Sequence, residues 1–184
     1  MTSLDTARLN RLATQGVPCA GCGALHREFF ELALDHPFSW GHAPLAGSGQ
    51  TGMRIGDDFL TRDRCRVTGV HFIRASLVLP IHDSDTPLRF SIWGSVSDDD
   101  FAACQSGTPP PEAGWSSWLS NSLPTYPADK GVAASLRTGA DRGPPRMVIV
   151  DDSHALYDAQ NRGITLDQAF AIYRSAGHDL DPPL

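Results

Sequence analysis

Two cysteines near the N-terminus of this 184-residue chain lie two residues apart in a glycine-containing turn. Residues 18–23 read PCAGCG, and His26 follows them. Two sulfur atoms can bind one metal ion only if the backbone between them turns sharply, and glycine permits the positive φ angles that such a turn needs. The motif therefore predicts a zinc knuckle, a tight turn whose two cysteines, Cys19 and Cys22, bind zinc.

A closed structural zinc site has four protein ligands. Besides the two cysteines of the turn, the candidates are His26, four residues after Cys22, and Cys65, from much farther along the chain. We therefore predict a structural zinc site formed by Cys19, Cys22, His26 and Cys65. Two alternatives stay open, namely thiols without a ligand role and a redox-active pair. A thioredoxin-like pair follows a hydrophobic strand, whereas residues 9–17 are polar and interrupted by glycine, so the redox interpretation is the weaker one.

The composition excludes several classes of partner. The chain has a formal net charge of −6, and its basic residues are scattered arginines with a single lysine, Lys130. Because nucleic acids and acidic membranes bind basic patches, we expect neither as a partner, and a protein is the partner class left open. The longest apolar runs, such as 75–81, are far shorter than the roughly 20 residues that span a bilayer. The N-terminus lacks the features of a signal peptide, so we expect a cytoplasmic protein whose cysteines are metal ligands or free thiols.

The remaining pattern predicts a single α+β domain over residues 1–184, and an apolar content of 41% is enough for a hydrophobic core. β-Branched and aromatic residues between turn sequences predict antiparallel strands, while cap residues and acidic first turns predict helices. The expected strands are 64–67, 70–81, 88–96, 132–138 and 146–150. The expected helices are 3–13, 98–104 and a last one that ends at Ser175 and packs on the sheet through Phe170 and Tyr173.

We divide this domain into three parts. Residues 1–62 contain the knuckle and a long loop, residues 63–150 form a mainly antiparallel sheet, and residues 151–177 form the C-terminal helices. The loop, 35–56, is rich in glycine, proline and serine and has no periodic pattern. Because a loop of this length is unusual in a compact domain, we expect it to carry a ligand-binding surface.

No catalytic constellation is recognisable in the sequence. His154 beside Asp151 and Asp152 is an acid/base combination of the kind that hydrolases use, but no Gly-x-Ser-x-Gly motif supplies a nucleophile. We interpret Asp152 or Ser153 as the cap of a following helix, and His154 as a residue with local hydrogen bonds. We therefore predict no catalytic residue.

Several short motifs follow one another in an order that resembles a bacterial family. They are CAGCG (19–23) with His26, DRC (63–65), FIR (72–74), LPI (79–81), WGSVS (93–97), WLSN (118–121) and DSH (152–154). This order is similar to that of the uncharacterised family called domain of unknown function 2199. The resemblance implies a small cytoplasmic bacterial protein with no assigned activity. It also implies that Cys19, Cys22 and Cys65 occupy matching cysteine positions.

These observations leave two functions from different classes. The first, which we favour, is a non-enzymatic binding module that is stabilised by a structural zinc site. The second is a metal- or thiol-dependent enzyme, a hydrolase or a redox protein, that uses the region of Cys19 and Cys22. The number of protein ligands discriminates between them, because four ligands indicate a structural site and three ligands with a water indicate a catalytic one.

Overall fold

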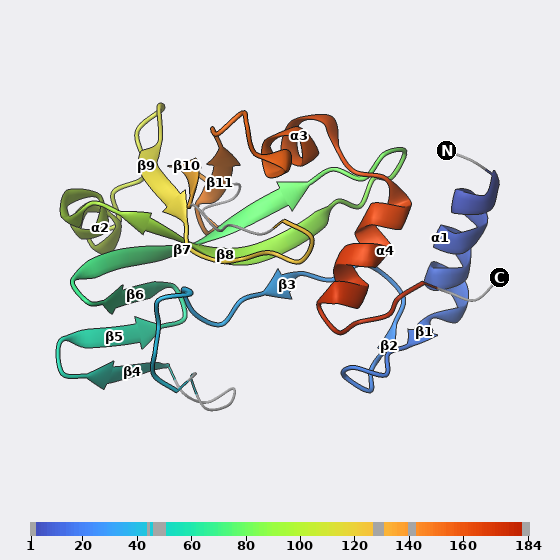
Figure 1. The fold of residues 1–184 in the computed structure, drawn as a ribbon, viewed down its shortest axis with the longest axis horizontal. Helices are drawn as coiled ribbons and strands as arrows, with labels where there is room; N and C mark the ends of the chain where they lie inside the picture. Colours follow the sequence, from blue (N-terminus) through green and yellow to red (C-terminus); the bar gives the residue numbers. More distant parts are fainter. Residues whose placement is uncertain (1–2, 44, 46–50, 127–130, 140–142, 182–184) are drawn as a thin grey trace.

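The computed structural model describes residues 3–43, 45, 51–126, 131–139 and 143–181. The helices are α1 (Ser3–Gln15), α2 (Asp98–Gln105), α3 (Ala155–Arg162) and α4 (Leu166–Ser175). The strands are β1 (Val17–Pro18), β2 (Leu25–His26), β3 (Leu32–Ala33), β4 (Gly52–Ile55), β5 (Asp58–Thr61), β6 (Arg64–Val67), β7 (Val70–Leu79), β8 (Leu88–Val96), β9 (Trp115–Leu119), β10 (Val132–Arg137) and β11 (Arg146–Ile149). Figure 1 shows a sheet-rich half, and a second half in which α1, α4 and the small β1–β2 hairpin gather near both termini.

Five strands of the main sheet close into a barrel. β7 and β8 pair antiparallel over nine residue pairs, from His71↔Val96 to Leu79↔Leu88. β8 pairs with β9, β9 with β10, and β10 with β11, all antiparallel, and β11 returns to β7 in a parallel pairing. Because β7 is a partner of both β8 and β11, the five strands form a closed ring.

Alternate side chains of the strands fill the barrel. Along β7, Ile73, Ala75 and Leu77 belong to the main hydrophobic core, as the two-residue repeat of a strand requires. Gly94 of β8 pairs with Ile73, and a Cβ atom at Gly94 would lie only 2.4 Å from Ser117 Oγ. Glycine at this position therefore lets β9 approach β8 closely.

Beyond the barrel, β7 continues into an extension that consists of β6, β5 and β4, each antiparallel to its neighbour. One face of this β4–β6 extension contributes to a second, smaller core cluster of Trp40, Leu60, Cys65, Val67, Phe72 and Trp93. On α2, the ring of Phe101 stacks on the ring of His71, with centroids 4.3 Å apart. The helix therefore packs against β7, and the extension has apolar contacts of its own.

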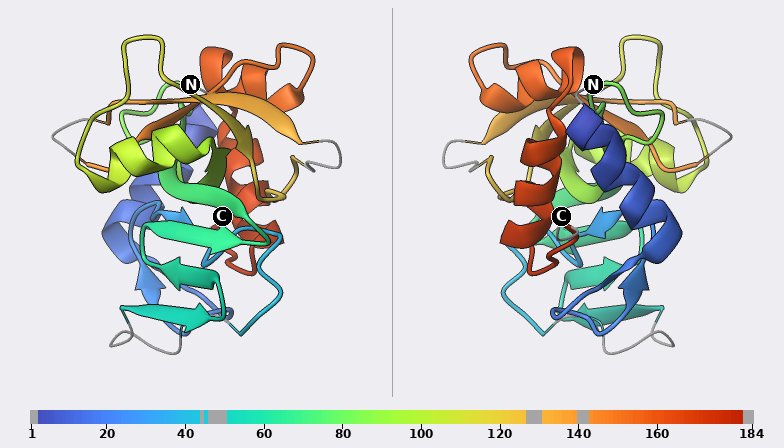
Figure 2. Two further views of the ribbon diagram at one scale, coloured as in Figure 1. Left: turned by 90° about the vertical axis from the view of Figure 1, so that its left-hand side faces the viewer. Right: turned by 90° about the vertical axis from the view of Figure 1, so that its right-hand side faces the viewer.

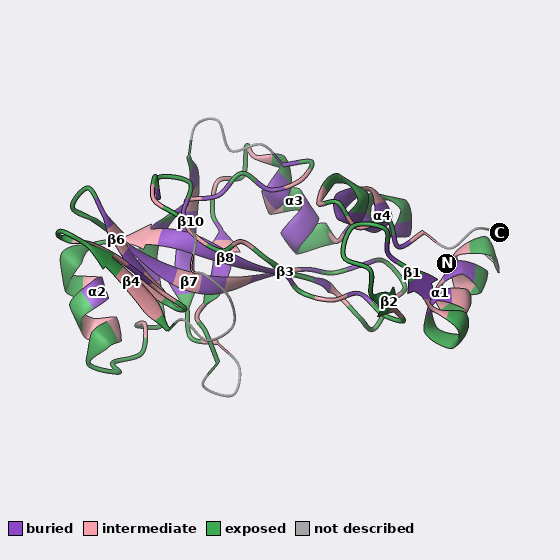
Figure 3. Ribbon diagram, turned by 90° about the horizontal axis from the view of Figure 1, so that it is seen from below, coloured by how far each residue is buried: buried purple, intermediate pink, exposed green. Residues whose placement is uncertain are grey.

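α1 and α4 lie side by side at the end of the molecule opposite the β4–β6 extension (Figures 1 and 2). Thr165 and Gln168 form a capping box that begins α4. The guanidinium of Arg8 in α1 lies 4.7 Å from the ring centroid of Phe170 and binds the carboxylates of Asp167 and Asp181. Figure 3 shows that β7 and β8 are largely buried, whereas β2 lies at the surface.

The α+β class agrees with the sequence prediction, and the strands predicted between 64 and 96 occur within two residues of their expected bounds. The sheet differs from the expected one because it closes into a barrel and because its β7–β11 and β3–β8 pairings are parallel. The sequence pattern also predicts neither β9 nor β4, which lies inside the expected loop 35–56. Residues 44 and 46–50 of that loop lie outside the described part of the chain.

Candidate metal centre

The two cysteines of the turn lie in a short hairpin, residues 17–26, which we call the knuckle. The backbone N–H of Cys19, just after β1, donates to the carbonyl of Ala24 at 2.9 Å, and the N–H of Gly23 donates to the carbonyl of Cys19 at 2.8 Å. Gly23 has a φ of +73°, a conformation that glycine adopts readily. These bonds place Cys19 and Cys22 in the turn and His26 on β2 beside them.

A fourth side chain comes from the C-terminal end of α4. The helix ends in a Schellman motif, in which the N–H of His178 donates to the carbonyl of Tyr173 at 2.8 Å and the N–H of Gly177 donates to that of Arg174 at 3.0 Å. Gly177 has a φ of +86°, which this motif requires. The backbone that carries His178 is therefore held by the helix end itself.

The knuckle packs directly on this helix end. A Cβ atom at Gly21 would lie 1.8 Å from the carbonyl oxygen of Gly177 and 3.7 Å from Cys19 Sγ. No real Cβ atom fits at 1.8 Å from an oxygen, so only glycine permits this approach of the two backbones. Gly21 thus brings the cysteine turn next to His178.

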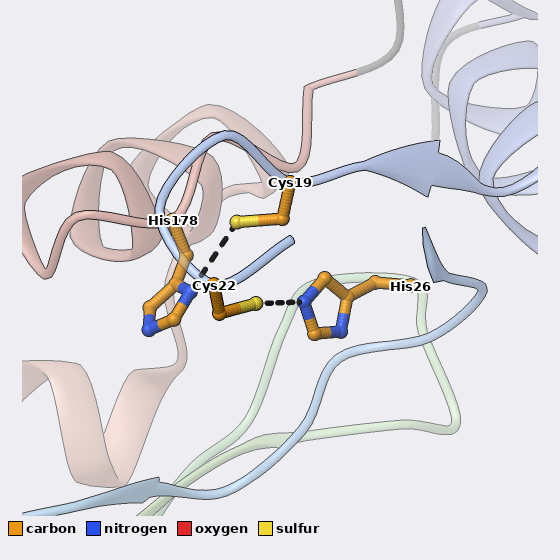
Figure 4. A group of neighbouring side chains, drawn as sticks. All are labelled: Cys19, Cys22, His26 and His178. Carbon is orange, nitrogen blue, oxygen red and sulfur yellow. Dashed lines mark hydrogen bonds between the residues drawn. The ribbon is translucent and has the colours of Figure 1, made fainter. Parts of the chain in front are cut away.

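Figure 4 shows four side chains that point toward one another, those of Cys19, Cys22, His26 and His178. Their candidate ligand atoms all lie within 4.8 Å of one another. Cys19 Sγ lies 3.4 Å from Nδ1 of His178, and Cys22 Sγ lies 3.1 Å from Nε2 of His26. Tetrahedral zinc, with its usual bond lengths, separates a sulfur from a nitrogen ligand by about 3.6 Å. The four side chains therefore need only small movements to surround a zinc ion.

The two thiols have different surroundings. Cys19 is buried, whereas Cys22 is exposed. Burial alone would raise the pKa of Cys19, but hydrogen bonds from the backbone of Cys22, from His178 and from the backbone of Gly21 outweigh it and lower the pKa to about 7. A thiolate is the form of cysteine that binds a metal, so these contacts favour a ligand state at Cys19.

Aromatic rings flank both histidines. The ring of His26 stacks on that of Phe30 with centroids 4.4 Å apart, and the rings of Phe30 and His178 meet edge to face at 5.0 Å. The hydroxyl of Tyr173 donates to the backbone carbonyl of Phe30 and so ties this residue to α4. Phe30 therefore orients the imidazoles from the knuckle and from the helix end.

Cys65 does not belong to this group. It lies in β6, buried in the second core cluster beside Leu60 and Phe72, and the described residues that share a candidate metal site do not include it. Burial, followed by the nearby carboxylate of Asp58, raises its pKa to about 12, so its thiol stays protonated. The structure therefore brings Cys19, Cys22 and His26 together but places Cys65 apart from them, and it places His178 beside the other three.

The other residues considered for catalysis have local roles. Nδ1 of His154 accepts a hydrogen bond from the N–H of Leu156 at 3.1 Å, so His154 itself is the N-cap of α3 in place of Asp152 or Ser153. The carboxylate of Asp151 accepts from the hydroxyl of Ser153 at 2.6 Å. These hydrogen bonds stabilise the start of α3, and they do not bring a nucleophile next to a general base.

Sequence reasoning missed His178. The available signal was weak, because Gly177 marks the end of the last helix and His178 is the next residue, but the chain contains seven histidines. Nothing in the spacing selects this one as the partner of a turn near the other terminus. His178 lies beside the two cysteines only because the knuckle packs on the end of α4.

Residues 18–164 match the model of a family described as uncharacterised protein conserved in bacteria, DUF2199. The chain belongs to this family. The match includes residues 18–26 of the knuckle and the barrel strands, and it ends before α4 and His178. No curated protein and no solved structure shows a significant match to the chain. None of the helices in the described part of the chain has the length and apolar character needed to cross a membrane.

Proposed function

We propose that this protein is a non-enzymatic binding module, and that a structural zinc ion bound by Cys19, Cys22, His26 and His178 fixes its N-terminal knuckle to the end of α4. The observation that carries this proposal is the convergence of four suitable ligand atoms within 4.8 Å. Two cysteines and two histidines make up a common structural zinc set, and four protein ligands leave no position for a reacting water.

The exposure of the knuckle supports a structural role for the metal. Val17 and Cys19 at the start of the knuckle are buried, but from residue 20 to residue 28 only His26 is half-buried and the others are exposed, so no apolar side chain of 20–28 enters the core. A segment without buried apolar surface gains little from the hydrophobic effect. Zinc binding would supply the missing stabilisation, because its binding free energy becomes folding free energy when the unfolded chain has no preformed site.

Exposed aromatic side chains support a binding role toward a protein. The side chain of Phe38 is 84% exposed and that of Trp118 is 56% exposed. Phe38 also lines a cavity of about 590 Å³, together with Val70, Phe72, Leu119 and several serines. Large exposed aromatic residues are typical of protein interaction surfaces.

A thiol-dependent enzyme is the second candidate. The observation that favours it is the thiol pair itself, because the pKa of buried Cys19 is lowered to about 7 and the thiol of Cys22 is exposed. A cavity of about 440 Å³ reaches His178 and offers space for a ligand. This function requires a cysteine pair that is free of metal, so metal content separates the two proposals.

The experiment is metal analysis of protein purified without added metal, followed by the same analysis of three variants. We expect about one zinc per chain in the native protein and in Cys65→Ala, loss of zinc in His178→Ala, and retention in His178→Cys, where a thiolate replaces the imidazole. Cys65→Ala is the matched control because Cys65 is buried outside the metal group.

Each other outcome has a definite meaning. Loss of zinc in Cys65→Ala with retention in His178→Ala would restore the ligand set predicted from the sequence. Native protein that contains no zinc and reduces a disulfide substrate to a dithiol, while Cys19 and Cys22 are oxidised to a disulfide, would favour the thiol-dependent enzyme.

A further inference from the structure

A cavity opens where β7 changes its partner. The N–H of Arg74 donates to the carbonyl of Asp63, just before β6, whereas the N–H of Ser76 donates to the carbonyl of Pro145, just before β11. β6 and β11 thus both begin along the same edge of β7 and leave a gap between them. The resulting cleft has a volume of about 760 Å³, and the C-terminal end of α2 contributes Cys104 to its lining.

Three arginines line this cleft in a protein whose formal net charge is −6. They are Arg62, Arg64 and Arg74, which come from the β5–β6 turn, from β6 and from β7. Among the described residues, the guanidinium groups of Arg64 and Arg74 have no carboxylate partner at ion-pair distance. Arg64 and Arg74 therefore bring positive charge to the cleft that no ion pair among the described residues neutralises.

Three carboxylates act on this charge, because Glu31 and Asp63 line the cleft and Asp35 also acts on Arg74. All three are exposed, whereas Arg64 and Arg74 are half-buried. Solvent screens exposed charges more strongly than half-buried ones, so the floor of the cleft stays positive. Burial lowers the pKa of Arg74 more than the neighbouring carboxylates raise it, and an arginine remains cationic in spite of such a shift.

Arg74 is held in position before any ligand arrives. Its Nη2 donates to the backbone carbonyls of Leu34 and Asp35 at 3.1 and 3.2 Å, and the guanidinium lies 4.9 Å from the ring centroid of Trp93. Its Nε is buried and has no hydrogen-bond partner in the described part of the chain. A fixed guanidinium loses little conformational entropy when it binds an anion.

We propose that this cleft between β6 and β11 binds a small anion that carries carboxylate or phosphate groups, with Arg64 and Arg74 as its main cationic partners. Planar guanidinium groups match the geometry of both kinds of anion. The site is separate from the cysteine and histidine group and shares no residue with it, so the proposal does not depend on zinc.

Titration calorimetry with inorganic phosphate and with succinate, at an ionic strength held constant with chloride, tests this site. We expect at least one of the two anions to bind, and Arg64→Gln to weaken that binding about tenfold, the effect of one lost charge-assisted hydrogen bond. Arg89→Gln removes the same charge from an exposed position of β8 outside the cleft, and we expect it to leave the affinity unchanged.

Alkylation of Cys104 locates the bound anion. Because Cys104 lines the cleft, an anion there slows its reaction with iodoacetamide, whereas the anion leaves the reaction rate of Cys22 outside the cleft unchanged, as peptide mass spectrometry measures. Protection by phosphate alone identifies a phosphoryl ligand, and protection by succinate alone identifies a carboxylate ligand. The proposal is overturned if neither anion protects Cys104 more than chloride does, or if Arg89→Gln weakens binding as much as Arg64→Gln.

Discussion

Cys19 and Cys65 are both buried, yet their surroundings shift the pKa values of the two thiols in opposite directions. Cys19 in the knuckle has the thiol of Cys22, the imidazole of His178 and backbone N–H groups as hydrogen-bond partners, and its pKa is lowered to about 7. Cys65 in the β4–β6 extension contacts apolar side chains, and its pKa is raised to about 12. Burial alone therefore does not decide what a cysteine does, because the polarity of its neighbours sets the sign of the shift.

The same contrast holds for stability. The extension has its own cluster of buried side chains, and Leu60 at its centre is completely buried. The knuckle has an exposed turn and four potential ligands. We infer that apolar packing holds the extension and that metal binding holds the knuckle, and three experiments test this difference.

The largest effect is expected from Cys19→Ala. In the zinc-bound protein this variant should lose several kcal/mol of unfolding free energy, because removal of one ligand abolishes most of the metal's contribution. Leu60→Ala should lose about 2–5 kcal/mol through the lost methyl groups and the cavity that remains. Thermal unfolding with and without a chelator distinguishes the loss of metal binding in Cys19→Ala from the loss of apolar packing in Leu60→Ala. We expect the chelator to destabilise the native protein and Leu60→Ala, but not Cys19→Ala.

An opposite result would reverse the comparison. If Cys19→Ala unfolds like the native protein while a thiol-dependent activity disappears, the knuckle is a chemical site and the structural role is wrong. If the chelator destabilises Cys19→Ala as strongly as the native protein, zinc is bound elsewhere.

A smaller effect is expected from Gly21→Ala, compared with Gly23→Ala. The new Cβ at Gly21 meets the backbone of Gly177, which cannot move aside without disturbing the end of α4, so we expect a loss of about 1–3 kcal/mol and weaker zinc binding. At Gly23 no atom lies within 4 Å of the new Cβ, and only the positive φ is unfavourable, at about 1 kcal/mol. Denaturant unfolding measures the stability of the two variants, and competition with a chelator measures their zinc affinity. Equal zinc affinities in the two variants would show that contact with α4 does not position His178.

The third experiment measures a difference in pH dependence on metal-free protein by following thiolate absorbance. The ordinary thiol pKa is 9.0 for both residues. Cys19 ionises more easily in the folded chain, so its contribution to stability is complete above pH 9 and is lost as the pH falls through about 7. Cys65 ionises less easily when folded, so its contribution is complete below pH 9 and is lost as the pH rises toward 12. Titration of both thiols near pH 9 would remove the contrast.

Local sequence signals predicted the parts of the site that depend on local geometry. Cys19, Cys22 and His26 lie within eight residues, so the turn chemistry of glycine is enough to bring them together. The capping box at Thr165 and the cap at Ser97 were predictable for the same reason, because each is a bond between residues three positions apart.

The rest depends on contacts between distant residues, which spacing does not encode. His178 reaches the knuckle only because Gly21 permits a close approach to α4. Cys65 resembles a ligand in the sequence, but its pairing with Leu60 and Phe72 directs it into an apolar cluster. Closure of the barrel likewise depends on the β7–β11 pairing, which joins strands more than 60 residues apart.

Cys19 and His178 are separated by 159 positions, so a metal ion between them would turn almost the whole chain into a ring. Closing a loop of this size restricts the unfolded chain by about 5 kcal/mol in the entropy model used for cross-links. The order of synthesis adds a second consequence. A ribosome delivers Cys19, Cys22 and His26 at least 152 positions before His178, so the four-ligand site would form only late in the synthesis of this sequence.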